Sequence, residues 1–191
     1  MRVLGVAGSP RKNGNTDLLL TEVLAGASSA GGQTKLIRLV EYDVGPCRHC
    51  DGCLKTGECI VQDDMQWIIS DLRNVDRLVM ASPVFFMGLS AQIKAMIDRC
   101  QCLWVMKDML GLPVATNCHG KRKGLFLSTG GTSYPGLFQP SLATIKAVFA
   151  VLDIEITGEL TFRGIDEKGV IVNHPTALRD AFAAGVDLVR W

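Results

Sequence analysis

The sequence predicts an α/β protein built on a five-stranded, doubly wound parallel sheet. Short apolar segments alternate with longer segments of helical spacing along the whole chain. Strands that are joined through helices form a parallel sheet covered on both faces. We expect right-handed crossovers. The strand order 2-1-3-4-5 is the natural candidate for such a sheet, with a ligand crevice beyond the carboxyl ends of the strands.

Each element follows from a local pattern. Five short segments, several of them rich in β-branched residues, have the composition of strands. They cover 2–7, 34–40, 77–82, 123–128 and 154–160. Apolar residues recur at the spacing of a helix that packs one face on a core over 15–30, 89–102, 141–152 and 176–189. One more helix is opened by Asp63 and Asp64, because acidic residues suit the positive end of a helix dipole.

The bulk composition predicts a single domain over 1–191. The 191 residues suffice for a substantial core, and the formal net charge is only +1. Such a weak charge argues against nucleic-acid partners, and no apolar run has the length of a membrane span. An odd total of seven cysteines fits a disulfide framework poorly. We therefore expect a cytoplasmic protein with no nucleic-acid or membrane partner.

A polar, glycine-containing turn follows the first strand. It reads Gly-Ser-Pro-Arg-Lys-Asn-Gly-Asn-Thr over 8–16. The free N–H groups and the helix dipole at such a turn bind phosphate. Ser9, Asn15 and Thr16 add neutral donors, and Arg11 adds a charged fork. The glycine patterns of P-loop and dinucleotide-binding proteins are absent, which argues against a nucleoside triphosphatase and against that type of dinucleotide site.

An apolar loop, Ser-Pro-Val-Phe-Phe-Met-Gly-Leu-Ser over 82–90, follows the third strand. In the expected strand order it faces the phosphate turn across the switch point. A ligand with a phosphate tail and a flat apolar head would span both, and flavin mononucleotide (FMN) has that shape. Phe85, Phe86 and Met87 would shield the ring, although such residues also pack at ordinary core edges. A Ser-Thr-Gly-Gly turn at 128–131 ends the fourth strand on the same edge.

A cysteine-rich loop at about 43–62 is inserted after the second strand. It places cysteines with C-x2-C-x2-C-x5-C spacing at Cys47, Cys50, Cys53 and Cys59. Four closely spaced thiolates suit a cubane iron–sulfur cluster. Structural zinc, with His49 as a substitute ligand, and vacant thiols are the alternatives. Cys100 and Cys102 lie at core spacing and are expected to pack.

Together these motifs resemble the NAD(P)H-dependent FMN reductase branch of the flavodoxin-like proteins. The phosphate turn, the segment 82–99 and the turn at 128–131 carry the resemblance. The cysteine motif followed by Asp-Asp-Met is similar to the iron–sulfur flavoprotein subgroup. The resemblance implies a flavodoxin-like fold, bound FMN, a [4Fe–4S] cluster on the four cysteines, and homodimers or homotetramers in which a cluster approaches a neighbouring flavin.

The resemblance also implies a set of FMN-binding residues. The phosphate would be held by Ser9, Arg11, Asn13, Asn15 and Thr16. The ring would be held by Pro83, Val84, Phe85, Phe86, Met87, Gly88, Ser128, Thr129, Gly130 and Gly131. No side chain is expected to act as a catalytic acid or base, because the cofactors carry the chemistry.

The function expected is that of an electron-transfer oxidoreductase coupling one- and two-electron carriers through FMN and a [4Fe–4S] cluster. NAD(P)H or a ferredoxin is the expected redox carrier. A cluster-free NAD(P)H-dependent FMN or quinone-type reductase is one alternative. A flavin-binding protein whose cysteines hold structural zinc is another.

Overall fold

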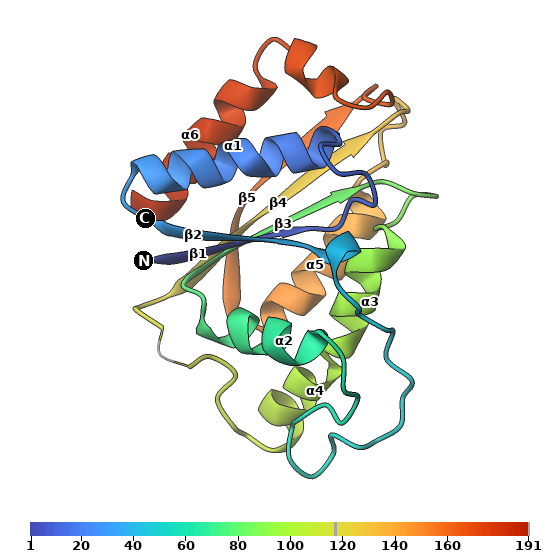
Figure 1. Cartoon of the computed structure of the whole chain (residues 1–191), viewed down its shortest axis with the longest axis vertical. Helices are drawn as coiled ribbons and strands as arrows, with labels where there is room; N and C mark the ends of the chain where they lie inside the picture. Colours follow the sequence, from blue (N-terminus) through green and yellow to red (C-terminus); the bar gives the residue numbers. More distant parts are fainter. Residues whose placement is uncertain (117, 191) are drawn as a thin grey trace.

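Five parallel strands form one sheet in the order β2-β1-β3-β4-β5, which confirms the expected topology. This computed structural model describes residues 1–116 and 118–190. The strands are β1 (Arg2–Ala7), β2 (Gln33–Arg38), β3 (Arg77–Pro83), β4 (Arg122–Gly130) and β5 (Ile154–Arg163). Figure 1 shows that their carboxyl ends share one edge of the sheet, opposite the two chain termini.

Helices cover both faces of the sheet (Figure 1). One face carries α1 (Asn15–Ser29) and α6 (Ala177–Arg190). The other carries α2 (Met65–Asn74), α3 (Ala91–Arg99), α4 (Gln101–Trp104) and α5 (Gln139–Val151). Short 3-10 turns occupy Leu39–Glu41 and Val170–Asn173, and a π-helical turn occupies Val105–Met109. Among the described residues, no helix is both long and apolar enough to cross a membrane.

Helices α1 and α6 pack with their backbones in contact. A Cβ added at Gly26 would lie 2.0 Å from the carbonyl oxygen of Phe182. One added at Gly185 would lie 1.9 Å from the carbonyl oxygen of Val23. Because real Cβ atoms do not approach backbone so closely, both glycines are needed for this crossing.

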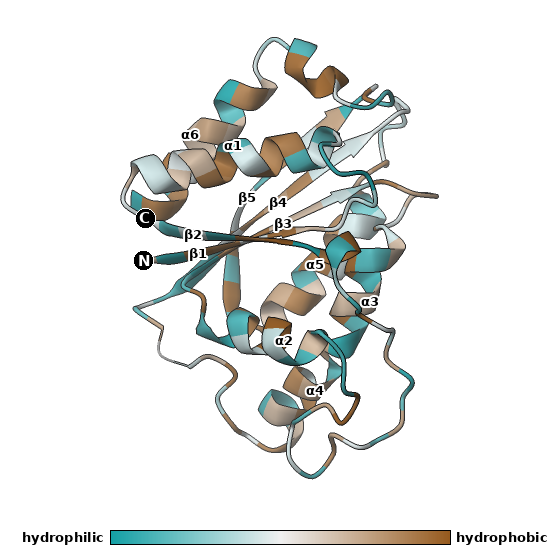
Figure 2. Ribbon diagram, viewed as in Figure 1, coloured by the Kyte–Doolittle hydropathy of each residue, from teal (hydrophilic) through white to brown (hydrophobic). Residues whose placement is uncertain are grey.

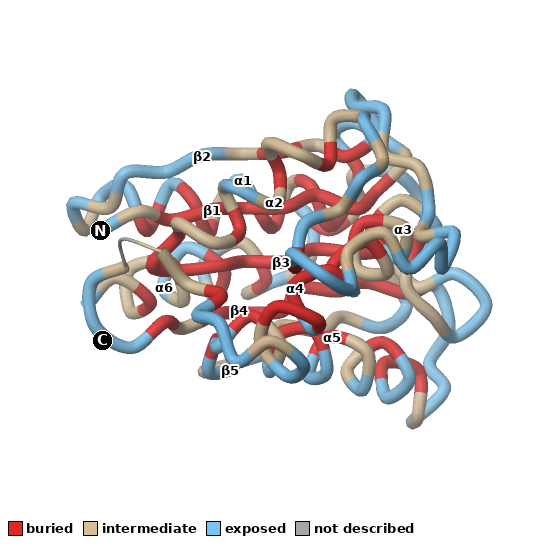
Figure 3. Tube along the Cα trace, turned by 90° about the horizontal axis from the view of Figure 1, so that it is seen from below, coloured by how far each residue is buried: buried red, intermediate tan, exposed pale blue. Residues whose placement is uncertain are grey.

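The sheet separates two apolar cores, as the alternation of side chains along a strand requires. Figure 2 shows the central strands as hydrophobic, and Figure 3 shows them as buried. The core toward α2, α3 and α5 includes Leu4, Met80 and Phe126. The core toward α1 and α6 includes Val3, Val79 and Leu125. Their burial on both faces makes β1, β3 and β4 the rigid base from which the site loops emerge.

Several element boundaries differ from the sequence prediction, and two of the differences have a clear local cause. The expected helix over 89–102 is divided, because Cys100 takes ψ near 0° between α3 and α4. Apolar spacing continues across this break, so periodicity alone could not reveal it. The second strand ends at Arg38, where the chain enters a 3-10 turn that buries Leu39.

Candidate functional site

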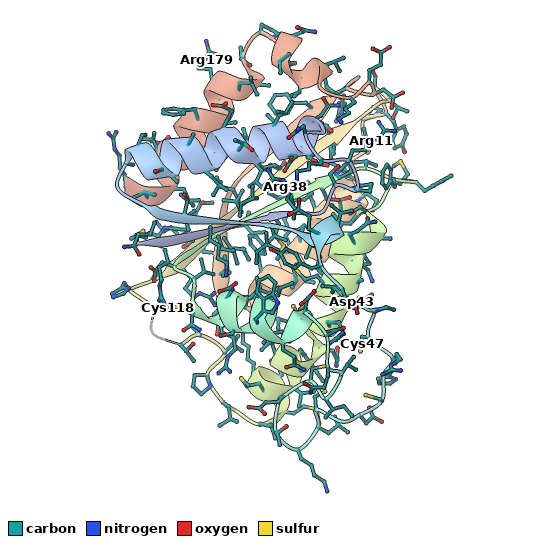
Figure 4. The ribbon with its side chains drawn as sticks, viewed as in Figure 1. Arg11, Arg38, Asp43, Cys47, Cys118 and Arg179 are labelled. Carbon is teal, nitrogen blue, oxygen red and sulfur yellow. The ribbon has the colours of Figure 1, made fainter. Side chains whose placement is uncertain are left out.

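The three loops expected to bind FMN meet at one cavity at the carboxyl edge of the sheet. We call it the flavin-edge cavity. The ends of β3 and β4, the first turn of α1 and the loops after β1, β3 and β4 contribute to its lining. These residues are Ser9, Arg11, Gly14, Asn15, Thr16, Pro83, Val84, Phe85, Thr129, Gly130 and Gly131. In Figure 4, Arg11 lies at this edge. Segments more than 100 residues apart in sequence therefore surround one space.

The phosphate turn is held in shape by its own polar groups. The Ser9 hydroxyl accepts a hydrogen bond from the Arg11 N–H at 3.1 Å. The N–H of Asn13, a residue with φ of +57°, donates to the Asp17 carboxylate at 2.8 Å. Arg38 Nε donates to the same carboxylate at 3.1 Å. Since Asp17 is occupied by these partners, its negative charge is balanced next to the expected phosphate position.

Thr16 presents a buried hydroxyl that lacks a partner among the described residues. Its side chain lies in the first turn of α1, the residue is only 1% exposed, and Oγ1 makes no hydrogen bond there. Gly14, the N-cap residue, offers no side-chain cap to that turn. A buried hydroxyl beside the first-turn N–H groups, at the positive end of a helix, suits a bound anion.

Several expected FMN ligands do not line this cavity. Asn13 is exposed, and Ser128 is buried with its hydroxyl donating to the Ser82 carbonyl at 2.7 Å. Gly88 closes a tight turn by pairing with Phe85 through two backbone hydrogen bonds of 3.0 and 2.9 Å. Between them, Phe86 and Met87 form the exposed tip.

This tip has an unusual backbone. Phe86 has φ of +47° and Met87 has φ of +66°, both in the left-handed region. That conformation costs about 1–2 kcal/mol for each non-glycine residue. Phe86 is also 107% exposed, so burial in this chain does not offset the cost. Strain of this kind is typical of ligand-binding loops.

A segment that the sequence analysis missed closes the flavin-edge cavity. Residues 164–171, which we call the strap, follow β5 and contribute Ile165, Asp166 and Lys168 to the cavity wall. Asn15 Nδ2 donates to the Glu167 carbonyl at 2.8 Å, and its Oδ1 accepts from the Ile171 N–H at 3.2 Å. Both polar atoms of the Asn15 side-chain amide are therefore engaged by the strap. Gly164 and Gly169, with φ of +69° and +82°, were the signal in the sequence that could have indicated the strap.

The four motif cysteines line a second cavity. Cys47, labelled in Figure 4, lies in the long loop between β2 and α2. Residues 42–64 contain no helix or strand, and the structure describes all of them. The four thiols are free, and only Cys50 among them is exposed. Within the described residues no three His, Cys, Asp or Glu side chains gather closely enough to hold a single ion.

Left-handed backbone positions shape this cysteine loop. His49 and Asp51, which flank Cys50, have φ of +48° and +58°. Gly57 has φ of +72°, and a Cβ added there would lie 2.8 Å from the Cβ of Met106. These reversals turn the chain inward, which brings closely spaced cysteines to one cavity.

A buried ion pair closes the base of the cysteine loop, and we call it the clamp. Arg99, at the end of α3 and only 1% exposed, binds the Asp63 carboxylate through Nη1 at 2.5 Å and Nη2 at 3.0 Å. The same guanidinium donates to the carbonyls of Gly45 at 3.1 Å and Val61 at 3.2 Å. Arg99 thus joins the two segments of the chain, at Gly45 and at Val61 to Asp63, where the loop begins and ends.

The electrostatics of the clamp favour the charged pair. Burial would raise the pKa of Asp63, but hydrogen bonds from Arg99, Met65 and Gly45 lower it below its ordinary value. Burial would likewise lower the pKa of Arg99, but Asp63 and the Cys59 thiol raise it. Sequence reasoning missed Arg99. The signal available was a charged residue at core spacing, three residues after Met96.

Comparison with known proteins assigns the chain to a family. The sequence profile of the NADPH-dependent FMN reductases matches residues 1–149. The chain belongs to the NADPH-dependent FMN reductase family. The strap lies beyond the matched residues, so this FMN reductase family member takes part of its cavity wall from outside the matched region.

Relatives of this family member include several iron–sulfur flavoproteins. One from Methanocaldococcus jannaschii is 39% identical over 118 residues, covering 60% of this chain and 61% of the relative. One from Archaeoglobus fulgidus is 42% identical over 101 residues, covering 53% and 51%. The matched part of the chain thus spans about half to two thirds of these two relatives. Another from A. fulgidus is 25% identical and aligns over 93% of this chain and 92% of its own length.

Solved structures share the flavodoxin-like fold. A flavone reductase superposes with a TM-score of 0.74 at 16% identity, covering 100% of this chain and 62% of that one. An NAD(P)H:quinone oxidoreductase from Methanothermobacter marburgensis gives 0.70 at 13% identity, covering 98% of both. At these identities the likeness extends to the fold alone.

A fifth thiol adjoins the motif cysteines in this FMN reductase family member. Cys102 is 2% exposed, as its expected packing role requires, yet it also lines the cysteine cavity. Burial, followed by the nearby Cys59 and Cys53, raises its pKa to about 12. Burial also raises the pKa of Cys53. Without a bound cation these inner thiols are therefore neutral at pH 7.

Proposed function

We propose that this chain is an iron–sulfur flavoprotein that transfers electrons between one- and two-electron carriers. The observation that carries the proposal is the pairing of two cavities in one domain. One has the phosphate donors and apolar wall that suit FMN, and the other has four thiols on a closed loop. When bound, FMN would exchange electrons singly or in pairs and a [4Fe–4S] cluster singly.

For FMN, the best support is the Thr16 hydroxyl, which has no partner among the residues that the structure describes and lies beside the first-turn N–H groups of α1. We propose that these groups bind the phosphate with Arg11, while Ser9 shapes the turn. Lys168 of the strap adds a second cation at the same cavity. The ring would lie against Pro83 to Phe85 and the backbone of Thr129 to Gly131. Asn13 and Ser128 would support these loops rather than contact FMN.

For the cluster, support comes from the donor set and its surroundings. Cys47, Cys50, Cys53 and Cys59 line one cavity, but among the described residues no three ligating side chains converge closely enough to hold a single ion. Zinc needs four ligands at one point, about 2.0–2.3 Å from the metal. A cubane cluster instead takes one thiolate at each of four separate irons. We therefore favour [4Fe–4S] over structural zinc.

We further propose NAD(P)H or a ferredoxin as the redox carrier, and a homodimer or homotetramer as the assembly. The exposed tip at Phe86 and Met87 supports the second point, since it leaves apolar surface at the rim of the flavin-edge cavity. The leading alternative, a cluster-free FMN or quinone-type reductase, is favoured by the description of the matching family.

Analysis of anaerobically purified protein tests the proposal. A visible spectrum, with FMN, iron, sulfide and zinc measured on the same sample, separates the candidates. The proposal predicts flavin bands with a broad brown shoulder and about four irons and four sulfides per chain. FMN with neither iron nor zinc would refute the proposal and support the cluster-free reductase. Zinc without sulfide would refute it and support the zinc-binding alternative.

A further inference from the structure

Arg99 lines the cysteine cavity and carries one donor that none of the described residues uses. Its two Nη atoms are engaged by Asp63, Gly45 and Val61. Its Nε–H is buried and has no hydrogen-bond partner within the described part of the chain. Leaving such a donor unpaired costs about 1–3 kcal/mol, and more for a charged group. A buried charged donor beside a cavity therefore indicates a ligand that it serves.

A motif cysteine shares this cavity with Arg99. Arg99 and Cys59 line the same cavity, and the Cys59 thiol is one of the groups that interact with the guanidinium. Arg99 lies on α3, whereas Cys59 lies near the end of the cysteine loop. The clamp with Asp63 fixes the guanidinium plane, so the direction of the Nε–H is fixed as well.

We propose that Arg99 is a positioning residue that sets the reduction potential of the cysteine site by donating its Nε–H to the Cys59 thiolate. This inference rests on the proposed function, because it requires an electron-accepting group on the four cysteines. Hydrogen bonds to the sulfurs and nearby charge are known determinants of cluster potentials. A fixed cation stabilises the reduced, more negative form, so Arg99 raises the potential and Asp63 partly offsets it.

Two variants of the clamp distinguish an electrostatic effect on the cluster potential from a merely structural role, because the first shifts the midpoint potential in the opposite direction to the second. Arg99→Gln removes the cation and the charged donor, and it should lower the cluster midpoint potential. Asp63→Asn removes the opposing anion and should raise it. Loosening of the loop alone would move both potentials in the same direction. The expected shift in each case is about tenfold in the reduction equilibrium, or 59 mV for a one-electron couple.

The measurement is an EPR-monitored redox titration of the anaerobically purified holoprotein, with iron and sulfide content determined first. Arg77→Lys is the matched control. Arg77 is also buried, but it binds the carbonyls of Leu188, Asp76 and Lys121 at the far edge of the sheet. This control should leave the cluster potential unchanged. Arg99→Lys retains the charge but not the fork, and its potential should lie between those of wild type and Arg99→Gln.

Each outcome bears on the inference. Unmoved potentials in iron-loaded Arg99→Gln and Asp63→Asn, or shifts of the same sign, would overturn it while leaving the proposed function intact. If Arg99→Gln loses its iron, a raised potential in Asp63→Asn supports the inference and an unchanged one refutes it. A wild-type protein with zinc and no sulfide would refute the proposed function, and the inference with it.

Discussion

At the flavin-edge cavity, the binding groups come from the ends of three buried strands and the first turn of a helix. At the cysteine loop, four thiols come from a segment without regular structure, which the clamp closes at its base. The first site is held by backbone hydrogen bonds of the sheet and by apolar cores. The second depends on a few charged side chains. We therefore expect mutations to separate the two sites.

The largest expected effect is loss of the metal centre on removal of one motif thiol. Cys50→Ser should abolish bound iron and sulfide, because a cubane cluster takes four cysteine ligands. FMN content should stay at the wild-type level, since Cys50 does not line the flavin-edge cavity. Iron, sulfide and FMN are measured on the same anaerobic sample. Cys118→Ser is the control that should retain iron. In Figure 4, Cys118 lies at the other end of the strands from Arg11, away from Cys47.

Breaking the clamp should destabilise the fold in a pH-dependent way. Removing one partner of a buried ion pair costs about 3–5 kcal/mol, so we expect Asp63→Asn to lower the free energy of unfolding by about this amount at pH 7. Asp63 has a lowered pKa when folded. Its contribution is therefore complete above the unfolded pKa near 4, and it is lost as pH falls through the folded pKa.

Urea unfolding of the metal-free protein checks this expectation. The difference between wild type and Asp63→Asn should stay constant from about pH 7 to pH 5 and shrink below about pH 4. Asp71→Asn is the control, because Asp71 forms a more exposed pair with Lys35 at 2.5 Å and such pairs contribute at most about 1 kcal/mol. A difference that grows toward acid pH would contradict the account of the clamp.

A smaller effect is expected at the phosphate turn. Arg11→Ala should weaken FMN binding by about 10- to 100-fold, the equivalent of one charge-assisted hydrogen bond. Riboflavin lacks the phosphate, so its affinity should be unchanged. Titration calorimetry on the apoprotein measures both ligands. Lys12→Ala is a close control, because the neighbouring Lys12 pairs with Glu41 at 2.8 Å and does not line the cavity. An equal loss of affinity for FMN and riboflavin would mean that Arg11 does not bind the phosphate.

The smallest effect is expected at the strained tip. Replacing Phe86 and Met87 by Asn and Gly should raise the free energy of unfolding of the apoprotein by about 1 kcal/mol, because those residues accept left-handed backbone conformations. A shift of the urea midpoint with an unchanged slope would show this. Tyr134→Asn, at another exposed aromatic residue, is the control. A decrease in stability would mean that the tip makes contacts that its exposure does not reveal.

The two regions also differ in how far the sequence could predict them. The strand order followed from regular alternation, and ten expected FMN ligands line one cavity because strand ends must share an edge. The shape of the cysteine loop could not be foreseen, since it depends on Arg99 from a distant helix and on non-glycine residues with positive φ. The strap was missed because Asn15, assigned to phosphate, binds it instead.

The central claim is that the cysteine loop delivers electrons to a flavin. Its most direct test is anaerobic stopped-flow reduction of the bound FMN by a reduced ferredoxin, in wild type and in Cys50→Ser with equal FMN content. The account predicts that flavin reduction is much slower in the cluster-free variant, whereas direct titration with dithionite reduces the same amount of flavin in both. Equal rates with ferredoxin in the two proteins would contradict it.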